Sequence, residues 1–316
     1  MKTDVYALGE LLIDLMEGSE SGQYEAKPGG APANALAMLE KLGSRTFLQA
    51  CVGADAFGRR LIQAASEAGI ATSGIRQDPL HPTTLAVVSR DENGDRTFSF
   101  YRQNTADLQL RPEDIDESRL QETEIVHFGT LSLVAEPARS TARELVTRAR
   151  QAGKHISFDP NLRENLWSDL EEAKEAMRWG LEQCDILKIS DNEIAFLTGT
   201  DNVAAGMEQL LADYPNVKVA AATRGKDGCL LYFPQGHAEH PGYAVEAIET
   251  TGAGDTFTGC LLRMVLEQDP ADWNQETVRS GLNLANAAAA LVTTRKGALC
   301  AMPEASEVET FLRSHV

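Results

Sequence analysis

The chain has 316 residues, of which 43% are hydrophobic and 24% are charged, as in ordinary globular domains. These proportions exclude a disordered tail, a collagen-like fibre and a coiled coil. Lys and Arg number 29 against 47 Asp and Glu, so the formal net charge is −18, and we expect neither nucleic acid nor an anionic membrane as a partner. A local site with Mg²⁺ can still bind an anionic nucleotide.

Strand and helix patterns alternate along most of the chain. A first strand is predicted over Val5–Gly9, and a helix over Ala33–Leu42 ends at Gly43. Further predicted strands are Phe47–Val52, Ile125–Gly129, His155–Asp159, Ile186–Ile189 and Lys218–Thr223, and further predicted helices are Arg59–Ala68, Ala138–Gln151 and Glu171–Leu181. This alternation predicts an α/β fold with a mainly parallel sheet and helices on both faces.

One segment departs from the alternation. Thr84–Ser89 and Arg96–Tyr101 flank Asn93-Gly94, which is the pattern of a β-hairpin with left-handed turn residues. Two short pieces near the amino terminus, Asp14–Met16 and Gln23–Ala26, are placed to add strands beside it. We interpret these pieces as a small sheet that projects from the main domain. An ordinary edge hairpin is the alternative.

The cysteines and the amino terminus indicate a reduced, cytoplasmic protein. The five cysteines are Cys51, Cys184, Cys229, Cys260 and Cys300. They form no CxxC pair, so we expect core residues rather than disulfides or a zinc site, and the six histidines show no metal-ligand spacing. Acidic residues interrupt the first 16 positions, and no apolar run approaches the ~18 residues of a membrane span. We expect neither a signal peptide nor a membrane helix.

The strongest chemical signal is the segment Glu249–Gly259, which contains Gly252-Ala253-Gly254 and precedes a helical pattern over Cys260–Leu266. A Gly-Ala-Gly turn that opens a helix leaves backbone N–H groups without intrahelical partners, and with the helix dipole they form an anion hole. A carboxylate such as Asp255 would repel a phosphate there, but it suits a base that deprotonates a hydroxyl attacking the phosphate. A helix cap is the alternative role, and the motif alone does not separate the two.

Two better-known phosphate-binding motifs do not fit the sequence. The dinucleotide motif G-x-G-x-x-G needs glycine where this chain has Phe257. A P-loop at Gly225-Lys226 would need glycine in place of Ala220 and Ser or Thr in place of Asp227. The chain is therefore neither a dinucleotide-binding protein nor a P-loop protein by motif.

Two further segments carry polar groups suited to a hydroxylated ligand. Gly29-Gly30 allows close approach of a ligand before a predicted helix, and Asn34 offers a donor and an acceptor to hydroxyls. Phe158–Arg163 follows a predicted strand, at the sheet edge where ligands of α/β proteins bind, and Arg163 suits a hydroxyl or a developing phosphate charge. The alternatives are a plain helix start and a strand-end turn with a surface arginine.

In this order and spacing, the segments resemble the ribokinase/PfkB family of carbohydrate kinases over essentially the whole chain. Within that family, the segments most similar to bacterial fructokinases are Gly29–Asn34, Asp159–Arg163, Leu187–Glu193 and Lys296–Ala298. The resemblance implies a ribokinase-like three-layer αβα sandwich, formed as one domain by residues 1–316. It also implies a discontinuous β lid over about 12–27 and 82–107, which closes over the sugar and can provide a homodimer contact.

The resemblance implies a role for each matching site residue. Asp255 matches the catalytic base, and Gly252, Ala253 and Gly254 match the anion hole for the transferred phosphoryl group. The implied sugar contacts are Asp14, Gly30, Asn34, Phe98, Tyr101 and Arg163. The implied ATP contacts are Lys188, Ser190, Glu193, Thr223, Gly225, Gly228, Gly254 and Asn286.

Two ion sites are implied in the same way. The family's Asn-x-x-Glu motif organises Mg²⁺ and phosphate, and Ser190 replaces its asparagine here while Glu193 keeps the carboxylate, so Glu193 is expected to bind Mg²⁺ through water. A monovalent cation such as K⁺ also serves some members. Its implied ligand positions are Glu249, Thr251, Val292, Arg295, Gly297 and Ala301, with Glu249 in place of the commoner Asp.

The predicted function is therefore an ATP-dependent sugar kinase that converts fructose to fructose 6-phosphate with Asp255 as base. A kinase for 2-keto-3-deoxygluconate is the main alternative, because Arg102 and Arg163 would suit its carboxylate. A riboside kinase is a further alternative. From another class, a sugar-binding regulator that lost the chemistry would explain the fold, but Asp255 is retained together with the Gly-Ala-Gly turn.

Overall fold

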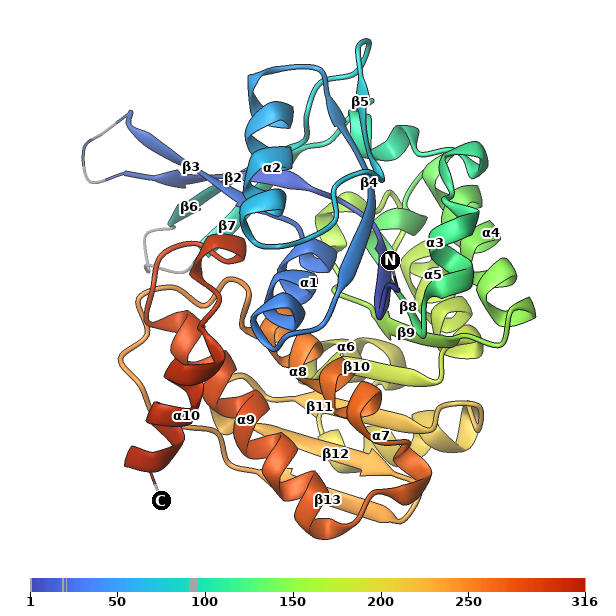
Figure 1. Cartoon of the computed structure of the whole chain (residues 1–316), viewed down its shortest axis with the longest axis vertical. Helices are drawn as coiled ribbons and strands as arrows, with labels where there is room; N and C mark the ends of the chain where they lie inside the picture. Colours follow the sequence, from blue (N-terminus) through green and yellow to red (C-terminus); the bar gives the residue numbers. More distant parts are fainter. Residues whose placement is uncertain (1, 19, 21, 91–95, 316) are drawn as a thin grey trace.

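The computed structural model describes residues 2–18, 20, 22–90 and 96–315. Nine strands of these residues form one sheet in the order β13-β12-β11-β10-β9-β8-β1-β4-β5 (Figure 1). Their bounds are β1 (Val5–Leu8), β4 (Thr46–Gly53), β5 (Ile75–Asp78), β8 (Ile125–Gly129), β9 (His155–Asp159), β10 (Ile186–Ser190), β11 (Val219–Thr223), β12 (Cys229–Phe233) and β13 (Gly236–His240). Neighbours from β5 to β11 run parallel, and β12 and β13 add an antiparallel edge. The prediction of a mainly parallel sheet is confirmed.

The antiparallel edge follows from short connections. Between β11 and β12 the chain makes only a tight turn around the 3-10 helix η5 (Gly225–Asp227), whereas a parallel crossover needs about a dozen residues. Gly228 has a φ of 78°, and a Cβ there would lie 1.9 Å from the carbonyl oxygen of His240, so the turn requires glycine. The sequence pattern did not predict β13, because this edge strand is mostly polar and exposed.

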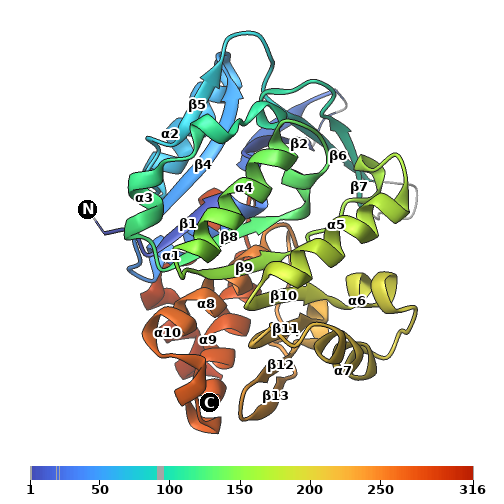
Figure 2. The ribbon, with the colours of Figure 1, turned by 90° about the vertical axis from the view of Figure 1, so that its right-hand side faces the viewer.

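Helices cover both faces of the sheet because the strands alternate apolar residues toward each side. In β1, Val5 and Ala7 pack under one layer, and Tyr6 and Leu8 under the other. The first layer holds α1 (Ala31–Lys41), α2 (Ala56–Glu67), α8 (Ala253–Glu267), α9 (Gln275–Thr293) and α10 (Ala305–Ser314), and the second holds α3 (Glu117–Glu122), α4 (Ala138–Gln151), α5 (Leu170–Gln183), α6 (Asp191–Thr198) and α7 (Val203–Asp213). Figure 1 and Figure 2 show the two layers from perpendicular directions. The three-layer αβα sandwich is confirmed.

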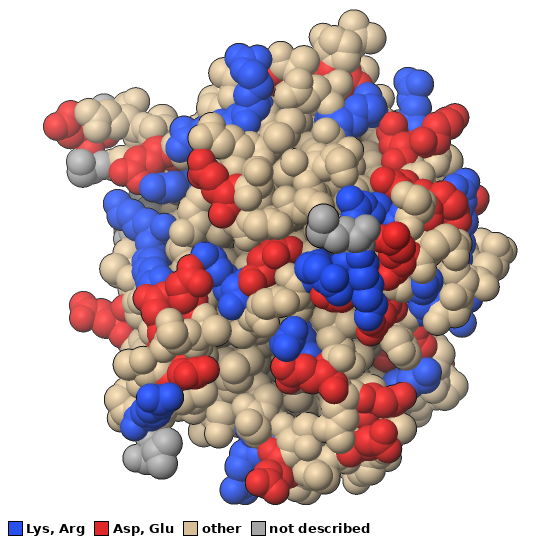
Figure 3. Space-filling model, viewed as in Figure 1, with Lys and Arg blue, Asp and Glu red and all other residues tan. Residues whose placement is uncertain are grey.

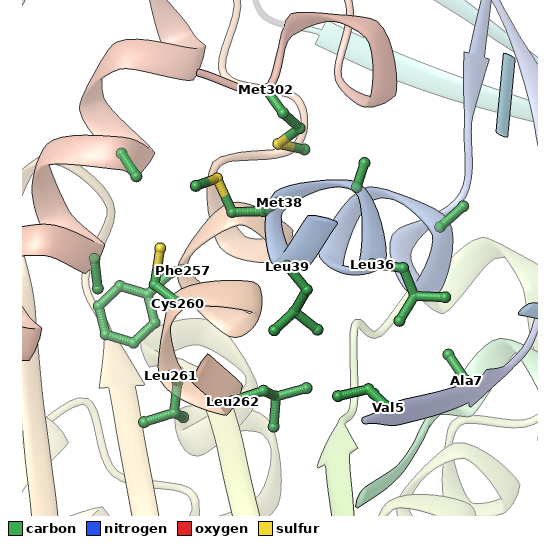
Figure 4. Close-up of a cluster of buried hydrophobic side chains, with 14 of the residues drawn as sticks. Val5, Ala7, Leu36, Met38, Leu39, Phe257, Cys260, Leu261, Leu262 and Met302 are labelled. Atoms are coloured by element: carbon green, nitrogen blue, oxygen red, sulfur yellow. The ribbon is translucent and has the colours of Figure 1, made fainter. Parts of the chain in front are cut away.

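Helices α1 and α8 pack against each other and against the same face of the sheet, with their amino-terminal ends next to each other. Met38 of α1 lies in one apolar cluster with Phe257 and Leu261 of α8, above β1 (Figure 4). The two helices approach closely at Gly259, where a Cβ would lie 2.7 Å from the carbonyl oxygen of Ala35. This packing fixes the amino-terminal ends of α1 and α8 relative to each other.

A second sheet projects from the main domain (Figure 1). It contains β2 (Leu12–Glu17), β3 (Tyr24–Gly29), β6 (Leu85–Arg90) and β7 (Arg96–Tyr101) in the order β3-β2-β6-β7. Strand β6 pairs in parallel with β2 rather than with the main sheet. The small sheet is therefore confirmed, and the edge-hairpin alternative is wrong. The predicted Asn93-Gly94 turn lies outside the described residues.

Two local expectations need correction. Helix α2 begins at Ala56 rather than at Arg59, because the Asp55 side chain accepts the N–H of Gly58 and caps the helix before its apolar pattern starts. Cys300 is exposed, whereas the other four cysteines are buried. The expectation of a core cysteine is wrong at position 300, which lies in the short 3-10 helix η7 (Leu299–Ala301) at the surface.

The surface carries both signs of charge. Basic and acidic side chains are intermixed over the face shown in Figure 3. None of the helices in the described part of the chain has the length and apolar character needed to cross a membrane.

Candidate active site

A cavity of about 420 Å³ opens where the carboxyl ends of β1, β9 and β10 meet the small sheet and the amino-terminal ends of α1 and α8. This volume suits a small-molecule ligand. The predicted site residues that line it are Asp14, Gly30, Asn34, Arg163, Lys188, Thr251, Gly252, Gly254 and Asp255. The fold thus brings residues from both ends of the chain into one site.

The start of α8 forms one wall of the cavity. Gly252 precedes the helix with a φ of 85°, and a Cβ at Gly254 would lie only 2.9 Å from the Lys188 Nζ. The Ala253 N–H donates to the Thr250 carbonyl within the turn. The N–H groups of Gly254 and Asp255 are therefore the ones that this helix start offers to an anion, with the dipole adding positive potential.

The Asp255 carboxylate faces the cavity from the first turn of α8. Burial, together with the Asp159 charge, raises the pKa of Asp255 to about 6. The Asn34 hydrogen bond and the charges of Lys188 and Arg163 oppose this rise. No side chain caps α8, whose N-cap residue is Gly252. Asp255 instead accepts a hydrogen bond from Asn34, so the helix-cap alternative is wrong.

Asn34 connects the first turns of α1 and α8. Its Nδ2 donates to Asp255 Oδ2 at 2.7 Å, and this hydrogen bond fixes the carboxylate in one orientation. Its Oδ1 is buried and accepts no hydrogen bond from the described protein atoms. A buried amide oxygen without a donor is costly, and a ligand hydroxyl in the cavity would satisfy it.

Asp14 and Arg163 bring opposite charges to the cavity. Burial, together with the nearby charges of Glu249 and Asp255, raises the pKa of Asp14 to about 7 against the opposing charge of Arg163. A Cβ at Gly29 would lie 2.5 Å from Asp14 Oδ2, so glycine is needed for the backbone of β3 to pass this carboxylate. Arg163 lies just after β9, where its Nη1 donates to the Leu162 carbonyl at 3.0 Å.

Sequence reasoning missed several residues of the cavity, of which Glu10 carries a charge. Glu10 follows β1, is 4% exposed, and accepts the Ala31 N–H at 2.9 Å. Burial raises its pKa to about 7 against the opposing charge of Arg102. Its position after the carboxyl end of a buried strand was the available signal. Phe100, Leu131 and Asn161 also line the cavity and were not assigned.

Two predicted contacts are corrected by the structure. Tyr101 is 66% exposed and does not line the cavity, whereas its neighbour Phe100 does; successive side chains of a strand point to opposite faces. Arg102 is buried away from the cavity lining, where it pairs with Asp107 at 2.7 Å and donates to the Leu131 carbonyl at 2.8 Å. It is therefore not placed to bind a substrate carboxylate. The side chain of Phe98 lies outside the described residues.

Lys188 lies on β10 beneath the start of α8. Its Nζ forms an ion pair with Asp159 at 3.2 Å, and Asp159 also accepts the Thr258 hydroxyl at 3.0 Å. Burial alone would lower the pKa of Lys188, but the carboxylates of Asp159, Glu193 and Asp255 hold it above its ordinary value. The ammonium group therefore stays charged next to Gly254.

The remaining predicted ATP contacts form a row along the same edge of the sheet. Ser190 pairs with Thr223 across β10 and β11, and Thr223 pairs with Cys229 across β11 and β12. The Asn286 Nδ2 of α9 lies 3.2 Å from Cys229 Sγ, and the turn residues Gly225 and Gly228 stand between Thr223 and Cys229. The structure therefore places these residues beside the cavity rather than in its lining.

Glu193 has a structural task that its motif did not reveal. Its Oε2 accepts the Ser190 N–H at 2.8 Å in a capping box at the start of α6. Its Oε1 accepts the Leu162 N–H at 2.7 Å. The carboxylate thereby joins the start of α6 to the loop that carries Arg163.

The implied cation ligands gather around Glu249. Glu249 is 4% exposed, and its Oε2 accepts the Gly297 N–H at 2.9 Å. Its own N–H donates to the Thr293 carbonyl, so the segment before α8 lies against the chain near residue 293. Apart from Thr251, the other implied cation ligands all lie within residues 292–301. The side chain of Arg295 points elsewhere and pairs with Glu307 at 2.6 Å. Val292 and Ala301 are buried. Among the described residues, no cluster of three or more His, Cys, Asp or Glu side chains could hold a metal ion.

Comparison with known proteins identifies the family of the chain. The family model "pfkB family carbohydrate kinase" matches residues 2–305. The chain is 36% identical to a probable fructokinase-2 from Arabidopsis thaliana over 99% of this chain and 96% of the relative. A fructokinase from Xylella fastidiosa with bound ATP superposes with a TM-score of 0.91 at 31% identity, over 100% of this chain and 99% of that one. A double-mutant fructokinase from Vibrio cholerae O395, in a fructose, ADP and potassium ion bound form, gives 0.90 at 34% identity over 98% of both chains. The chain belongs to the pfkB family of carbohydrate kinases.

Proposed function

We propose that the protein is an ATP-dependent fructokinase, which transfers the γ-phosphoryl group of ATP to fructose and forms fructose 6-phosphate. The observation that carries the proposal is the Asp255 carboxylate at the start of α8, hydrogen-bonded to Asn34 and next to Gly254 in one cavity. Phosphoryl transfer to a hydroxyl requires a base and a site for the transferred charge side by side. The fructokinases among the relatives and solved structures support fructose as the acceptor.

Different residues around the cavity have different roles in the proposed reaction. Asp255 accepts the proton of the attacking hydroxyl while that oxygen bonds to the γ-phosphorus and the bond to the leaving ADP oxygen breaks. A pKa of about 6 leaves Asp255 mainly ionised at neutral pH and still close to the range where a base works best. The N–H groups of Gly254 and Asp255, with the Lys188 ammonium, stabilise the charge on the phosphoryl group.

The charges of the cavity favour a neutral sugar over a sugar acid. Three carboxylates line it, those of Glu10, Asp14 and Asp255, against the cations of Arg163 and Lys188. Lys188 is paired with Asp159. Of the two arginines that were expected to suit a substrate carboxylate, Arg163 lines the cavity and Arg102 does not. A substrate carboxylate would have to compete with these three carboxyl groups for the cations of the cavity, whereas fructose presents hydroxyls to Asn34 Oδ1 and to the carboxyl groups.

Two ions fit the donor atoms that the structure provides. Glu193 would hold Mg²⁺ through water, because both of its carboxylate oxygens already accept backbone N–H groups; Mg²⁺ neutralises phosphate charge when it binds with ATP. K⁺ would be held by Glu249 and by backbone carbonyls of residues 292–301, since oxygen ligands suit such a cation. Bound there, K⁺ would order the turn that presents the α8 N–H groups.

The small sheet is proposed to act as a lid and as a dimer contact. Its inner residues Asp14 and Phe100 line the cavity, so its movement toward the main domain would enclose the sugar and exclude water. Its two edge strands, β3 and β7, carry Tyr24 and Tyr101 with exposed fractions of 52% and 66%. Exposed aromatic residues favour protein contacts. The proposed location of the enzyme is the cytoplasm, where ATP and free sugars are available.

Turnover with a sugar panel tests the proposed function. We expect ATP-dependent phosphorylation of fructose with a higher kcat/KM than for 2-keto-3-deoxygluconate or a riboside. Asp14→Ala should weaken fructose use sharply, since a hydrogen bond to a charged group contributes about 1.5–3 kcal/mol, or roughly ten- to hundred-fold in kcat/KM. Sugar binding without any turnover would instead indicate the regulator. A higher kcat/KM for the acid, abolished by Arg163→Ala, would assign the enzyme to the acid.

A further inference from the structure

Asp159 is a buried carboxylate that stands behind the cavity and has no role in the mechanism above. It ends β9 and is 3% exposed. Its oxygens lie 3.2 and 3.3 Å from Lys188 Nζ, and Oδ2 also accepts the Thr258 hydroxyl at 3.0 Å. A buried charge is costly unless it is paired and hydrogen-bonded, and Asp159 satisfies both conditions with residues of two other elements.

These contacts connect the strand that holds Lys188 with the helix that holds the base. Thr258 is one turn after Asp255 on α8, so its hydroxyl ties Asp159 to the body of that helix. Lys188 contacts both oxygens of Asp159, and its ammonium lies against Gly254 in the wall of the cavity. Asp159 therefore determines where the Lys188 charge stands relative to the start of α8.

Two other carboxylates also act on Lys188. Its charge interacts with those of Glu193 and Asp255 as well as with that of Asp159, but both Glu193 oxygens already accept backbone N–H groups. A direct ion pair between Lys188 and Asp255 would stabilise the ionised base and draw the ammonium away from the transferred phosphate. The ion pair with Asp159 holds Lys188 in its place beside Gly254.

We propose that Asp159 is a positioning residue of phosphoryl transfer: it fixes the Lys188 ammonium beside the anion hole and keeps it from pairing with Asp255, while Thr258 fixes Asp159. The proposal rests on the proposed kinase function and adds two residues to it. Neither Asp159 nor Thr258 touches the sugar cavity as a lining residue, so their loss should leave sugar binding intact.

The proposal predicts a change in pH dependence as well as in rate. The groups that act on Asp255 are Asn34 of α1, Asp14 of β2, Asp159 of β9, Lys188 of β10 and Arg163 after β9. Removing the Asp159 charge removes a repulsion and frees Lys188 to pair with the base. Both effects stabilise the ionised form of Asp255, so its pKa must fall.

The test compares Asp159→Asn, at the carboxyl end of β9, with the matched control Asp185→Asn, at the amino-terminal end of the neighbouring strand β10. Asp185 precedes β10, accepts the Ile156 N–H at 2.9 Å and lies 3.8 Å from Lys218, so Asp185→Asn makes the same change far from the cavity. We expect Asp159→Asn to lower kcat roughly 10- to 100-fold, the usual effect of misplacing a catalytic group. KM for fructose should change less than about twofold, and the acid limb of the kcat/KM profile should move to lower pH. Asp185→Asn should match the wild type in all three.

Variants at Thr258 keep the test informative if Asp159→Asn folds poorly. Thr258→Val keeps the shape but removes the hydroxyl that contacts Asp159 at 3.0 Å and the Gly254 carbonyl at 3.1 Å. It should give a smaller loss of the same kind, and Thr258→Ser should restore wild-type kcat. Calorimetric binding supplies a readout without turnover. Affinity for ADP should be unchanged in Asp159→Asn, whereas affinity for ADP with aluminium fluoride and fructose, a mimic of the phosphoryl group in transfer, should fall about tenfold or more.

The outcomes separate this inference from the proposed function. A wild-type protein that phosphorylates no sugar overturns the function, and the inference with it. An active wild type overturns the inference alone if Asp159→Asn or Thr258→Val retains wild-type kcat. The inference is also overturned if these folded variants lose only fructose affinity, or if the acid limb stays in place or moves to higher pH.

Discussion

Substituting Gly252 by alanine tests the turn that presents the anion hole. Gly252 has a φ of 85°, and a Cβ there would lie 2.7 Å from the Cβ of Ala298. The left-handed conformation costs a non-glycine residue about 1–2 kcal/mol, and overpacking costs about 1–3 kcal/mol more. We therefore expect Gly252→Ala to lower the free energy of unfolding by about 2–5 kcal/mol.

Gly43 offers a control with nearly the same backbone. Its φ is 82°, and a Cβ there would meet nothing within 4 Å, so Gly43→Ala carries only the conformational cost of about 1–2 kcal/mol. The difference between the two variants measures the contact with Ala298. Gly43 follows α1 far from the cavity lining, so its substitution should leave turnover unchanged.

Urea unfolding and initial-rate kinetics together provide the assay. Turnover of Gly252→Ala should fall by roughly 10²-fold, because a shift of about 1 Å in the presented N–H groups has an effect of that size. If Gly252→Ala is no less stable than Gly43→Ala and keeps wild-type kcat, the conformation of this turn does not present the N–H groups, and the assignment of the anion hole is refuted.

Three further predictions concern the carboxylates of the site. The pKa of Asp14 is raised to about 7 from 3.8, so the folded protein holds a proton between these values that the unfolded chain has released, and stability falls as pH rises through this window. Asp14→Asn should therefore raise the melting temperature at pH 8 relative to the wild type while it weakens fructose use; a lower melting temperature would contradict this. Asn34→Ala removes the hydrogen bond that lowers the pKa of Asp255, so the acid limb of kcat/KM should move to higher pH and KM for fructose should rise, and an unmoved profile would refute the coupling. K⁺ should raise kcat over a bulky organic cation at equal ionic strength through the site at Glu249, and equal rates would remove the ion from the mechanism.

The glycine turn that opens α8 could be predicted from sequence because it depends on consecutive residues. Gly252, Gly254 and Asp255 signal a phosphate-binding helix start wherever the helix lies in the fold. The parallel sheet was predictable for a similar reason, since buried strands and amphipathic helices each show their own period. The helix starts were placed less well, because a first turn such as that of α2 carries a cap rather than an apolar pattern.

Residues that meet through the topology could not be placed in advance. Glu10 and Asp159 each end or follow a strand, and only the order of strands in the sheet brings Glu10 into the cavity lining and Asp159 behind it. Phe100 and Tyr101 look equally suited to a sugar in sequence, but pairing of β6 with β2 turns Phe100 to the cavity and Tyr101 to the outside. The ion pair of Arg102 with Asp107 likewise depends on how the chain leaves β7.

The most direct test of the proposed mechanism is the turnover of Asp255→Asn with ATP and fructose. Asparagine has nearly the same shape and can still accept the Asn34 hydrogen bond, so folding and fructose binding should be retained. Loss of the proton acceptor should lower kcat by roughly 10²–10⁴-fold, the usual contribution of a general base. A folded Asp255→Asn variant with near wild-type kcat would contradict the assignment of Asp255 as the base.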